Sequence, residues 1–266
     1  MIRPDWTVHK NIHDKIDLSY NVCYDAQVIN QINSLIQNTS IDFRSYPDEA
    51  KAYDILSSFY NKSAYNITIG QGLSELISRV LQIFRNKKIH IISPTWAPVK
   101  ALCDSYHIES STVDGDVLYL ANPNGRTGKL LERNQVLHLC KKYEYVIADE
   151  AYHDFSQEDS SILNQPENLI VLKTLSKSIS TAGIRCGYAF ANKNITTKLQ
   201  EIRPAYVTNS LVISFLEDFL NMIEPHTERM ISTRAYLEHE YWCRKSYANF
   251  VLLFIIIYNL SILFYK

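Results

Sequence analysis

Between residues 65 and 191, short apolar segments alternate with longer segments of helical spacing, and this alternation limits the possible folds more than any other feature of the chain. The apolar segments are predicted to be strands at Tyr65–Ile69, Ile89–Ser93, Val117–Ala121, Tyr145–Asp149, Leu169–Lys173 and Gly187–Ala191. Helices are predicted at 26–37, 48–61, Ser74–Phe84, Trp96–Ser105, Glu132–Lys142 and 221–245. Apolar strands that alternate with helices are typical of an α/β domain with a mostly parallel sheet, whose strand ends line a ligand crevice.

Charge and cysteine usage exclude several classes of function. Lys and Arg together number 27 and Asp and Glu 28, so no basic stripe indicates nucleic-acid binding. The five cysteines lie far apart, which disfavours a zinc site or a disulfide framework, and we expect no metal. The N-terminus (1–6) lacks the apolar core of a signal peptide, so the cytoplasm is the default location.

The last apolar run, Phe250–Tyr265, is interrupted only by Asn259 and Ser261. A membrane-spanning helix needs roughly 20 residues, so this run is short for a membrane anchor. A core strand, or an aberrant tail after a frame change in the coding sequence, fits the run better.

Glycine placement marks three further segments. The chain has only seven glycines, and six of them form the pairs Gly70 and Gly72, Gly125 and Gly128, and Gly183 and Gly187. Glycine is required where the backbone adopts a positive φ or approaches a ligand closely, although ordinary turns are the alternative.

The segment Thr174-Leu-Ser-Lys177 follows a predicted strand end, and Arg185 comes eight residues after the lysine. A lysine whose amine is kept deprotonated can form a Schiff base, and arginine is the forked partner of a phosphate. The segment therefore suits an anionic carbonyl cofactor, with a solvated lysine in a Ser/Thr-rich loop as the alternative.

Asp149 ends another predicted strand and is followed by Glu150, Tyr152 and Asp154. A carboxylate at a buried strand end needs a cationic or hydrogen-bonding partner, which a protonated ring nitrogen supplies, and Tyr152 could bind the ring hydroxyl. A metal or phosphoryl site is the alternative, which the absence of a Walker-type loop disfavours.

Two upstream segments complete the predicted site. Gly70–Glu75 joins a strand to a helix, where backbone N–H groups bind phosphate and Ser74 is a plausible N-cap. Trp96 follows Pro94 and Thr95 and either stacks on a planar ring or lies in the core.

Six motifs in this order resemble those of fold-type I, class I/II aminotransferases, most closely histidinol-phosphate aminotransferase and threonine-phosphate decarboxylase. They are Gly-Gln-Gly-Leu-Ser-Glu, Pro-Thr-Trp, Asn-Pro-Asn-Gly-Arg-Thr-Gly, Ala-Asp-Glu-Ala-Tyr, Thr-Leu-Ser-Lys and Ala-Gly-Ile-Arg-Cys-Gly-Tyr. The resemblance runs from about residue 17 to 252. It implies an N-terminal arm with part of a small domain (1–45), a cofactor-binding large domain (46–220) and the incomplete start of a small α+β domain (221–266).

The resemblance implies pyridoxal phosphate as cofactor. Lys177 would attach it as a Schiff base, Asp149 would pair with its ring nitrogen, Tyr152 would contact its ring oxygen and Trp96 would stack on the ring. The phosphate would be held by Leu73, Ser74, Thr174, Ser176 and Arg185, and Gly72 would also belong to the cofactor-binding residues. The resemblance also implies a homodimer, in which Tyr46 reaches the neighbouring subunit's site, and places Asn21 in the N-terminal arm.

Two departures from the family pattern matter. Gly125-Arg126 replaces an Asn-Pro pair, so the family's asparagine contact with the ring oxygen is lost or shifts to Asn124. Segment 248–253 resembles the first strand of the C-terminal domain, and the family's carboxylate-binding arginine has no match in the chain. The arginines that do not occupy an equivalent motif are Arg203, Arg229, Arg234 and Arg244.

The expected reaction is transamination between an amino acid, or a phosphorylated amino compound such as histidinol phosphate, and a 2-oxo acid. Two alternatives stay open: a decarboxylase of a phosphorylated hydroxy-amino acid, which shares these motifs, and a truncated, inactive fragment of an aminotransferase. The partners are then small molecules and a second copy of the chain, with nucleic acid and membrane disfavoured.

Overall fold

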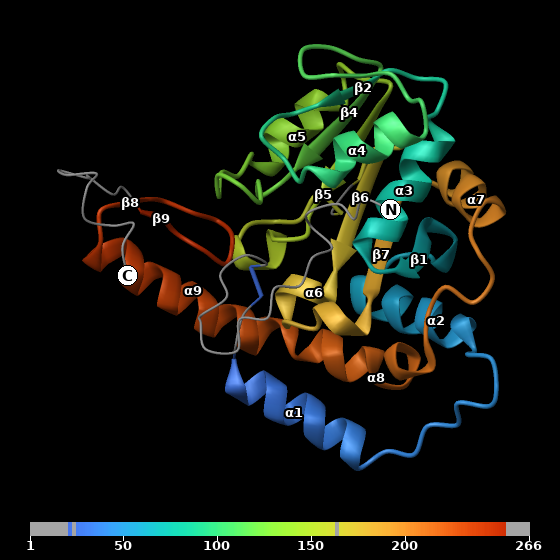
Figure 1. Cartoon of the computed structure of the whole chain (residues 1–266), viewed down its shortest axis with the longest axis vertical. Helices are drawn as coiled ribbons and strands as arrows, with labels where there is room; N and C mark the ends of the chain where they lie inside the picture. Colours follow the sequence, from blue (N-terminus) through green and yellow to red (C-terminus); the bar gives the residue numbers. More distant parts are fainter. Residues whose placement is uncertain (1–20, 23–24, 163–164, 254–266) are drawn as a thin grey trace, which may run out of the picture.

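The computed structural model describes residues 21–22, 25–162 and 165–253, and a seven-stranded sheet forms its centre (Figure 1). The sheet has the strand order β1-β7-β6-β5-β4-β2-β3. Strand β7 pairs antiparallel with both of its neighbours and the remaining pairs are parallel. The strands are β1 Ile67–Gln71, β2 Ile89–Ile91, β3 Ser110–Ser111, β4 Val117–Ala121, β5 Tyr145–Asp149, β6 Leu169–Thr174 and β7 Cys186–Phe190. The predicted α/β class with a mostly parallel sheet is confirmed.

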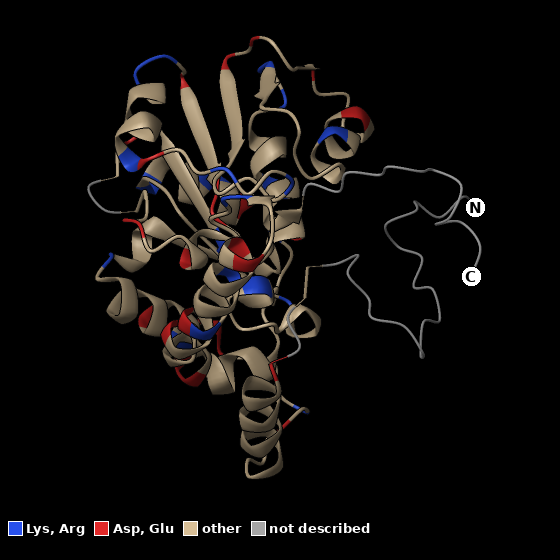
Figure 2. Ribbon diagram, turned by 90° about the vertical axis from the view of Figure 1, so that its left-hand side faces the viewer, with Lys and Arg blue, Asp and Glu red and all other residues tan. Residues whose placement is uncertain are grey.

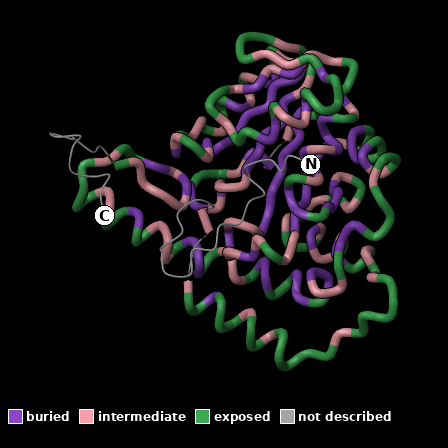
Figure 3. The backbone as a smooth tube through the Cα atoms, in the orientation of Figure 1, coloured by how far each residue is buried: buried purple, intermediate pink, exposed green. Residues whose placement is uncertain are grey.

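Helices cover both faces of this sheet. On one face, residues of β4 such as Leu118 and Leu120 pack in one core with α2 (Glu49–Tyr60), α5 (Arg133–Leu139) and α8 (Ser210–Asn221). On the other face, Val117 and Tyr119 belong to a second core with α3 (Leu73–Ile83), α4 (Pro98–Ser105) and α7 (Lys193–Glu201). Because both faces are buried, the central strands are apolar without interruption, which is the pattern in the sequence. Figure 3 shows these strands as the buried centre of the molecule.

The first strand begins later than predicted. Tyr65 belongs to a 3₁₀ turn, Ala64–Asn66, whose N-cap is Ser63, and β1 starts at Ile67. The side chain of Ser63 accepts a hydrogen bond from the Tyr65 N–H, which stabilises the turn at the expense of strand geometry. Tyr65 is consequently 71% exposed and lies outside the core.

The start of α3 also corrects a prediction. Gly72, with a φ of +76°, is the N-cap and makes no side-chain hydrogen bond, so Ser74 is not the cap. Ser74 is the exposed second residue of the helix. Helices α7 and α8, which we did not predict, begin at caps Asn192 and Asn209, whose side chains accept hydrogen bonds from first-turn N–H groups.

The N-terminal helix α1 (Ala26–Gln37) is linked to α9 (Ile223–Glu240) through its half-buried N-cap, Asp25. Asp25 caps α1, accepts hydrogen bonds from Arg229 and lies 2.8 Å from Nδ1 of His226. Burial opposes the charged form of Asp25, but the hydrogen bonds from His226 and Arg229 lower its pKa to about 2. The arm is thereby attached to α9, although α1 itself is mostly exposed (Figure 3).

The chain after α9 forms a short two-stranded sheet, β8 (Cys243–Arg244) with β9 (Leu252–Leu253). Phe250–Tyr265, for which we weighed a membrane anchor, lies mostly outside the described residues, as does the N-terminal segment 1–20. In the ranges that the structure describes, no helix has both the length and the apolar character to cross a membrane. Lys, Arg, Asp and Glu are interspersed over the ribbon (Figure 2). The predicted domain boundaries stay a prediction.

Candidate active site

Three residues that are far apart in the sequence meet beyond the carboxyl ends of β5 and β6. Lys177 lies in α6 (Leu175–Ser178), Tyr152 follows β5, and Asn21 belongs to the N-terminal arm. The Asn21 side-chain amide donates to the Tyr152 hydroxyl at 3.2 Å, and Nζ of Lys177 lies 3.5 Å from the Asn21 carbonyl oxygen. The same Nζ lies 5.8 Å from the centre of the Tyr152 ring. The structure thus brings together the expected lysine, tyrosine and asparagine.

Lys177 occupies a largely desolvated position. Its helix has only four residues and is capped by Thr174, whose hydroxyl oxygen accepts from the Ser176 N–H at 3.2 Å. Burial disfavours the ammonium form and lowers the pKa of Lys177 from 10.5 to about 8. A substantial fraction of the amine is therefore a neutral nucleophile at mildly alkaline pH.

We expect the Lys177 amine to gain reactivity as the pH rises through about 8, because deprotonation creates the nucleophile. Reductive methylation of cofactor-free protein over a pH series, with peptide mass spectrometry, measures this midpoint. The denatured chain is the control, since an unfolded lysine titrates near a pKa of about 10.4. A midpoint for Lys177 equal to that of the denatured chain would contradict the burial argument.

Asp149 is a buried carboxylate on the same face of the sheet as the second core. Its Oδ2 accepts from the Tyr119 hydroxyl at 2.5 Å and its Oδ1 from the Ala151 N–H at 3.1 Å. Burial raises the pKa of Asp149, and the neighbouring charge of Glu150 acts in the same direction. Among the described residues no Lys, Arg or His forms an ion pair with Asp149. A cationic ring nitrogen is the type of partner that this carboxylate lacks.

Tyr119 is a site residue that the sequence reading missed. It lies in β4 and pairs with Ile147 of β5. Because Ile147 is two residues before Asp149, the side chains of Tyr119 and Asp149 lie on the same face of the sheet. A signal was available, because a tyrosine within an otherwise aliphatic buried strand needs a partner for its hydroxyl.

Gly72, Gly187 and Arg185 form a tight cradle between β1, α3 and β7. A Cβ on Gly72 would lie 2.7 Å from Cζ of Arg185, and a Cβ on Gly187 would lie 2.6 Å from the Gly72 carbonyl carbon. The backbone N–H groups of Leu73 and Ser74 begin α3 at this point. Glycine is required here because any side chain would fill the space between the helix start and the guanidinium.

Thr174 and Ser176 border the cradle. The Thr174 hydroxyl lies 2.8 Å from the Cys186 carbonyl oxygen, which ties the end of β6 to the start of β7, and 3.0 Å from the Ser176 hydroxyl. Arg185 donates from Nη1 to the Ala182 carbonyl at 2.9 Å, which leaves other guanidinium N–H groups for an anion. The residues expected at the phosphate therefore lie together.

Trp96 and Asn124 are the two remaining residues that we expect to contact the cofactor ring. Trp96 is 38% exposed in the segment between β2 and α4. The Asn124 side chain donates to the Pro94 carbonyl at 2.7 Å and accepts from the N–H groups of Arg126 and Thr127. Asn124 therefore stabilises its own loop, and its contact with a ring oxygen stays a prediction.

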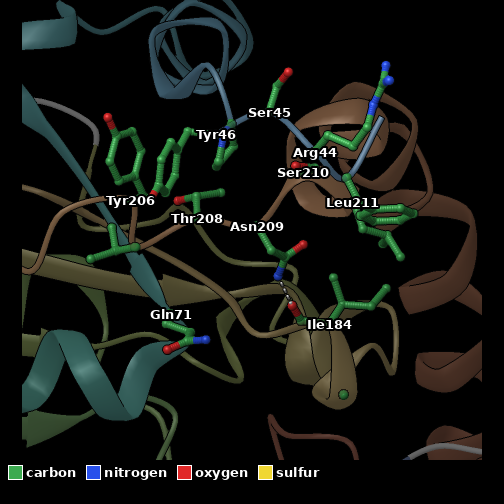
Figure 4. A pocket seen from close by; sticks show the side chains of 14 residues that line it. Arg44, Ser45, Tyr46, Gln71, Ile184, Tyr206, Thr208, Asn209, Ser210 and Leu211 are labelled. Carbon is green, nitrogen blue, oxygen red and sulfur yellow. Dashed lines mark hydrogen bonds between the residues drawn. The ribbon is translucent and has the colours of Figure 1, made fainter. Parts of the chain in front are cut away.

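Tyr46 lies apart from Lys177. It is 77% exposed and stacks on Tyr206 with ring centroids 4.2 Å apart. Both tyrosines line a groove of about 630 Å³ that extends to Gln71 and Ile184, as Figure 4 shows. The expected role of Tyr46 in a neighbouring subunit's site stays a prediction.

The residues present fit the phosphate and the ring of pyridoxal phosphate. The cradle offers a guanidinium beside the backbone at the start of α3, Asp149 lacks a cationic partner among the described residues, and Lys177 has a lowered pKa. In addition, Oδ1 of Asn249, whose Nδ2 donates to the Asn21 carbonyl at 3.0 Å, is buried without a hydrogen-bond partner among the described residues. No group of three or more His, Cys, Asp or Glu in the described ranges could hold a metal ion.

Comparison with known proteins gives the same family over most of the chain. The sequence profile of aminotransferase class I and II matches residues 13–241. The histidinol-phosphate aminotransferase of Pyrococcus furiosus is 32% identical over 244 residues, which cover 80% of this chain and 71% of that protein. The histidinol-phosphate aminotransferase of Thermoanaerobacter pseudethanolicus is 30% identical over 238 residues, 77% of this chain and 68% of that protein.

Solved structures share the fold at lower identity. The histidinol-phosphate aminotransferase of Clostridium acetobutylicum superposes with a TM-score of 0.70 at 22% identity, covering 86% of this chain and 80% of that one. The L-threonine-O-3-phosphate decarboxylase of Porphyromonas gingivalis gives a TM-score of 0.69 at 19% identity, with coverages of 86% and 83%. The histidinol-phosphate aminotransferase of Sinorhizobium meliloti, solved in complex with pyridoxal-5'-phosphate, gives 0.73 at 17%, with coverages of 85% and 71%.

Proposed function

This chain belongs to the class I and II aminotransferases, a pyridoxal-phosphate-dependent family, and we propose that it transfers the amino group of histidinol phosphate, or of a similar phosphorylated amino compound, to a 2-oxo acid. One observation carries the proposal. A lysine with a lowered pKa lies in a site that also contains a buried carboxylate and an anion cradle. The similarity to the histidinol-phosphate aminotransferases of Pyrococcus furiosus and Thermoanaerobacter pseudethanolicus supports this substrate class.

The site residues take the following roles in this proposal. Lys177 attaches the cofactor, Asp149 pairs with the ring nitrogen, and Tyr152 contacts the ring oxygen. Asn21 orients Tyr152, to which it donates a hydrogen bond. The phosphate is held by the N–H groups at the start of α3 and by the side chains bordering the cradle, namely Gly72, Leu73, Ser74, Thr174, Ser176 and Arg185, and Trp96 lies against the ring.

When bound, pyridoxal phosphate supplies an aldehyde that condenses with amines and a protonated ring that withdraws electrons from the substrate's Cα. The protein supplies proton transfer and orientation. The neutral amine of Lys177 would take the proton from Cα and deliver it to the former aldehyde carbon, C4′, which its lowered pKa permits near pH 8. Asp149 stays ionised beside the ring cation, because the attraction outweighs the burial that raises its pKa.

Arg126 is our candidate for the substrate's anionic group. Its guanidinium is exposed and forms no hydrogen bond or ion pair with any residue in the described ranges, and it follows Gly125, which packs on the Tyr152 ring. Other arginines considered are already paired: Arg203 with Glu49, Arg229 with Asp25, and Arg234 with two backbone carbonyls. A bidentate arginine recognises carboxylate and phosphate groups.

We expect Arg126→Gln to raise KM for histidinol phosphate by about tenfold or more, because a charge-assisted hydrogen bond is worth about 1.5–3 kcal/mol. Cofactor binding should be unchanged, since Arg126 lies outside the phosphate cradle. Steady-state kinetics and a pyridoxal-phosphate titration separate the two effects. Lys129→Gln is the matched control, because it removes an exposed cation from the same loop. An unchanged KM would remove Arg126 from the substrate site.

We propose a homodimer, in which the exposed Tyr46 and its groove face a second copy of the chain. The stacked pair of Tyr46 and Tyr206 presents apolar ring surface, which is the type of residue enriched at protein interfaces. Sedimentation of the purified chain is expected to show a dimer that Tyr46→Asp weakens. A monomer at micromolar concentration would contradict this assignment.

The substrate proposal is tested with histidinol phosphate and 2-oxoglutarate in the presence of pyridoxal phosphate. Formation of glutamate without release of carbon dioxide is the expected result. Release of carbon dioxide from threonine phosphate would favour the decarboxylase, whose fold the chain also shares. A protein that binds the cofactor at Lys177 but turns over neither substrate would be the inactive fragment.

A further inference from the structure

A buried ionic cluster is formed by residues that neighbour the candidate site residues in the sequence. Nζ of Lys173 is 2.7 Å from Oδ1 of Asp154 and 3.8 Å from Oε2 of Glu150. The side chains of Lys173, Glu150 and Asp154 are 4%, 0% and 15% exposed. Glu150 also accepts from the Ser160 hydroxyl at 2.5 Å and from the Ser161 N–H at 2.9 Å. Charges buried to this degree require such partners.

This cluster lies on the opposite face of the sheet from Asp149. Lys173 pairs in register with Tyr188, which belongs to the first core, whereas Asp149 pairs with Leu172 of the second core. Each member of the cluster nevertheless neighbours a site residue in the sequence: Glu150 follows Asp149, Lys173 precedes Thr174, and Asp154 is two residues past Tyr152. The cluster and the candidate site are therefore built on the same backbone segments.

Lys173 and Lys177, which are four residues apart, have pKa values that are shifted in opposite directions. Burial opposes the charge on Lys173, but attraction by Asp154, with Tyr60 and Glu150, raises its pKa above the usual value. Burial likewise opposes the charge on Asp154, and Lys173 lowers its pKa. Lys177, for which burial is the cause of the shift, has a pKa of about 8. The buried carboxylates are thus engaged by Lys173 and do not hold a proton on Lys177.

One hydrogen bond connects the cluster to the helix that carries Lys177. The Ser178 hydroxyl donates to Oδ2 of Asp154 at 2.6 Å, and it also lies 3.0 Å from the Thr174 carbonyl. Helix α6 has four residues, so few backbone hydrogen bonds fix its position. A hydrogen bond to a buried carboxylate, itself fixed by Lys173, therefore holds the last residue of this short helix.

We propose that Asp154, Lys173 and Ser178 are positioning residues, which hold α6 so that the Lys177 amine stays inside the desolvated site. The proposal rests on the proposed role of Lys177 as the cofactor lysine. It assigns a function to buried charges that lie on the opposite face of the sheet from Asp149.

Ser178→Ala removes the connection while leaving the charges paired. We expect the reductive-methylation midpoint of Lys177 in cofactor-free protein to rise by about one pH unit, a tenfold fall in the deprotonated fraction. Affinity for pyridoxal phosphate should fall by about tenfold, because the loss of a hydrogen bond to a charged group shifts an equilibrium by at least this factor. Both changes follow from α6 moving toward water.

Ser160→Ala is the matched control. It removes a hydroxyl-to-carboxylate hydrogen bond of similar length from the same cluster, but from Glu150, whose hydrogen bonds come from Ser160 and Ser161 and not from α6. The Lys177 midpoint should stay near 8 in this variant, even where the melting temperature falls as much as in Ser178→Ala. Equal Lys177 midpoints in the wild type and Ser178→Ala would overturn the proposal, whereas a wild-type midpoint near 10.5 would overturn the proposed function of Lys177.

A second variant covers the case in which Ser178→Ala does not fold. The double change Asp154→Leu with Lys173→Met removes the ion pair as a unit, a replacement that proteins often tolerate, and leaves Glu150 with its hydrogen bonds from the Ser160 hydroxyl and the Ser161 N–H. Ser178 then loses its carboxylate acceptor, and the Lys177 midpoint should again rise by about one pH unit. A folded double variant with an unchanged midpoint would contradict the positioning role.

Discussion

Replacing Asp149 with alanine is expected to weaken pyridoxal-phosphate binding by at least tenfold and to abolish the half-reaction with an amino donor. The carboxylate is buried, and the Tyr119 hydroxyl and the Ala151 N–H already occupy part of its hydrogen-bonding capacity. An ion pair with the ring nitrogen contributes both affinity and the protonated state of the ring, so alanine removes both. Spectrophotometric titration and single-turnover kinetics measure the two effects.

Conservative variants distinguish the effect of the Asp149 charge from an effect on the fold. Asp149→Glu keeps the charge at a shifted distance and should retain part of the binding. Tyr119→Phe removes only a neutral donor to Oδ2, so binding should persist and the half-reaction should slow less than in Asp149→Ala. Binding by Asp149→Ala equal to that of the wild type would mean that the carboxylate is only structural.

The second large effect is expected for Lys177→Ala. Removing the general acid–base typically slows proton transfer by about 10²–10⁴-fold, and removing the covalent attachment should also let the cofactor dissociate during gel filtration. Lys129→Ala, which changes an exposed lysine, should leave both properties unaltered. Added methylamine should restore part of the half-reaction, because it supplies a neutral amine to an otherwise intact site. Full activity of Lys177→Ala would exclude Lys177 as the catalytic base.

Strands that are aliphatic and bounded by polar residues could be predicted closely from the sequence. The bounds of β4 and β5 are those predicted, because apolar runs buried on both faces admit little ambiguity. Strand β1 was misplaced by two residues, since Tyr65 favours strand by propensity but is held in a turn by Ser63. Side-chain hydrogen bonds of this kind compete with regular structure and leave a weak signal in the sequence.

The sequence indicated candidate site residues where one residue type determines the chemistry, as for Lys177, Asp149 and Arg185, and their roles stay predictions. Tyr119 was missed because its role depends on the register between β4 and β5, which the sequence does not specify. The different environments of Lys173 and Lys177 could not be predicted from the sequence either. Both lysines lie near the end of β6. Lys173 belongs to the strand and meets the buried carboxylates, whereas Lys177 belongs to the helix that follows it.

The central claim is that Lys177 holds the cofactor, and reduction with borohydride tests it most directly. Purified chain mixed with pyridoxal phosphate should turn yellow, and borohydride should fix the phosphopyridoxyl group on the peptide that contains Lys177. Lys173, four residues away and paired with Asp154, should remain unlabelled because its amine stays protonated. Label on Lys173 or another lysine, or no label on folded protein, would contradict the account.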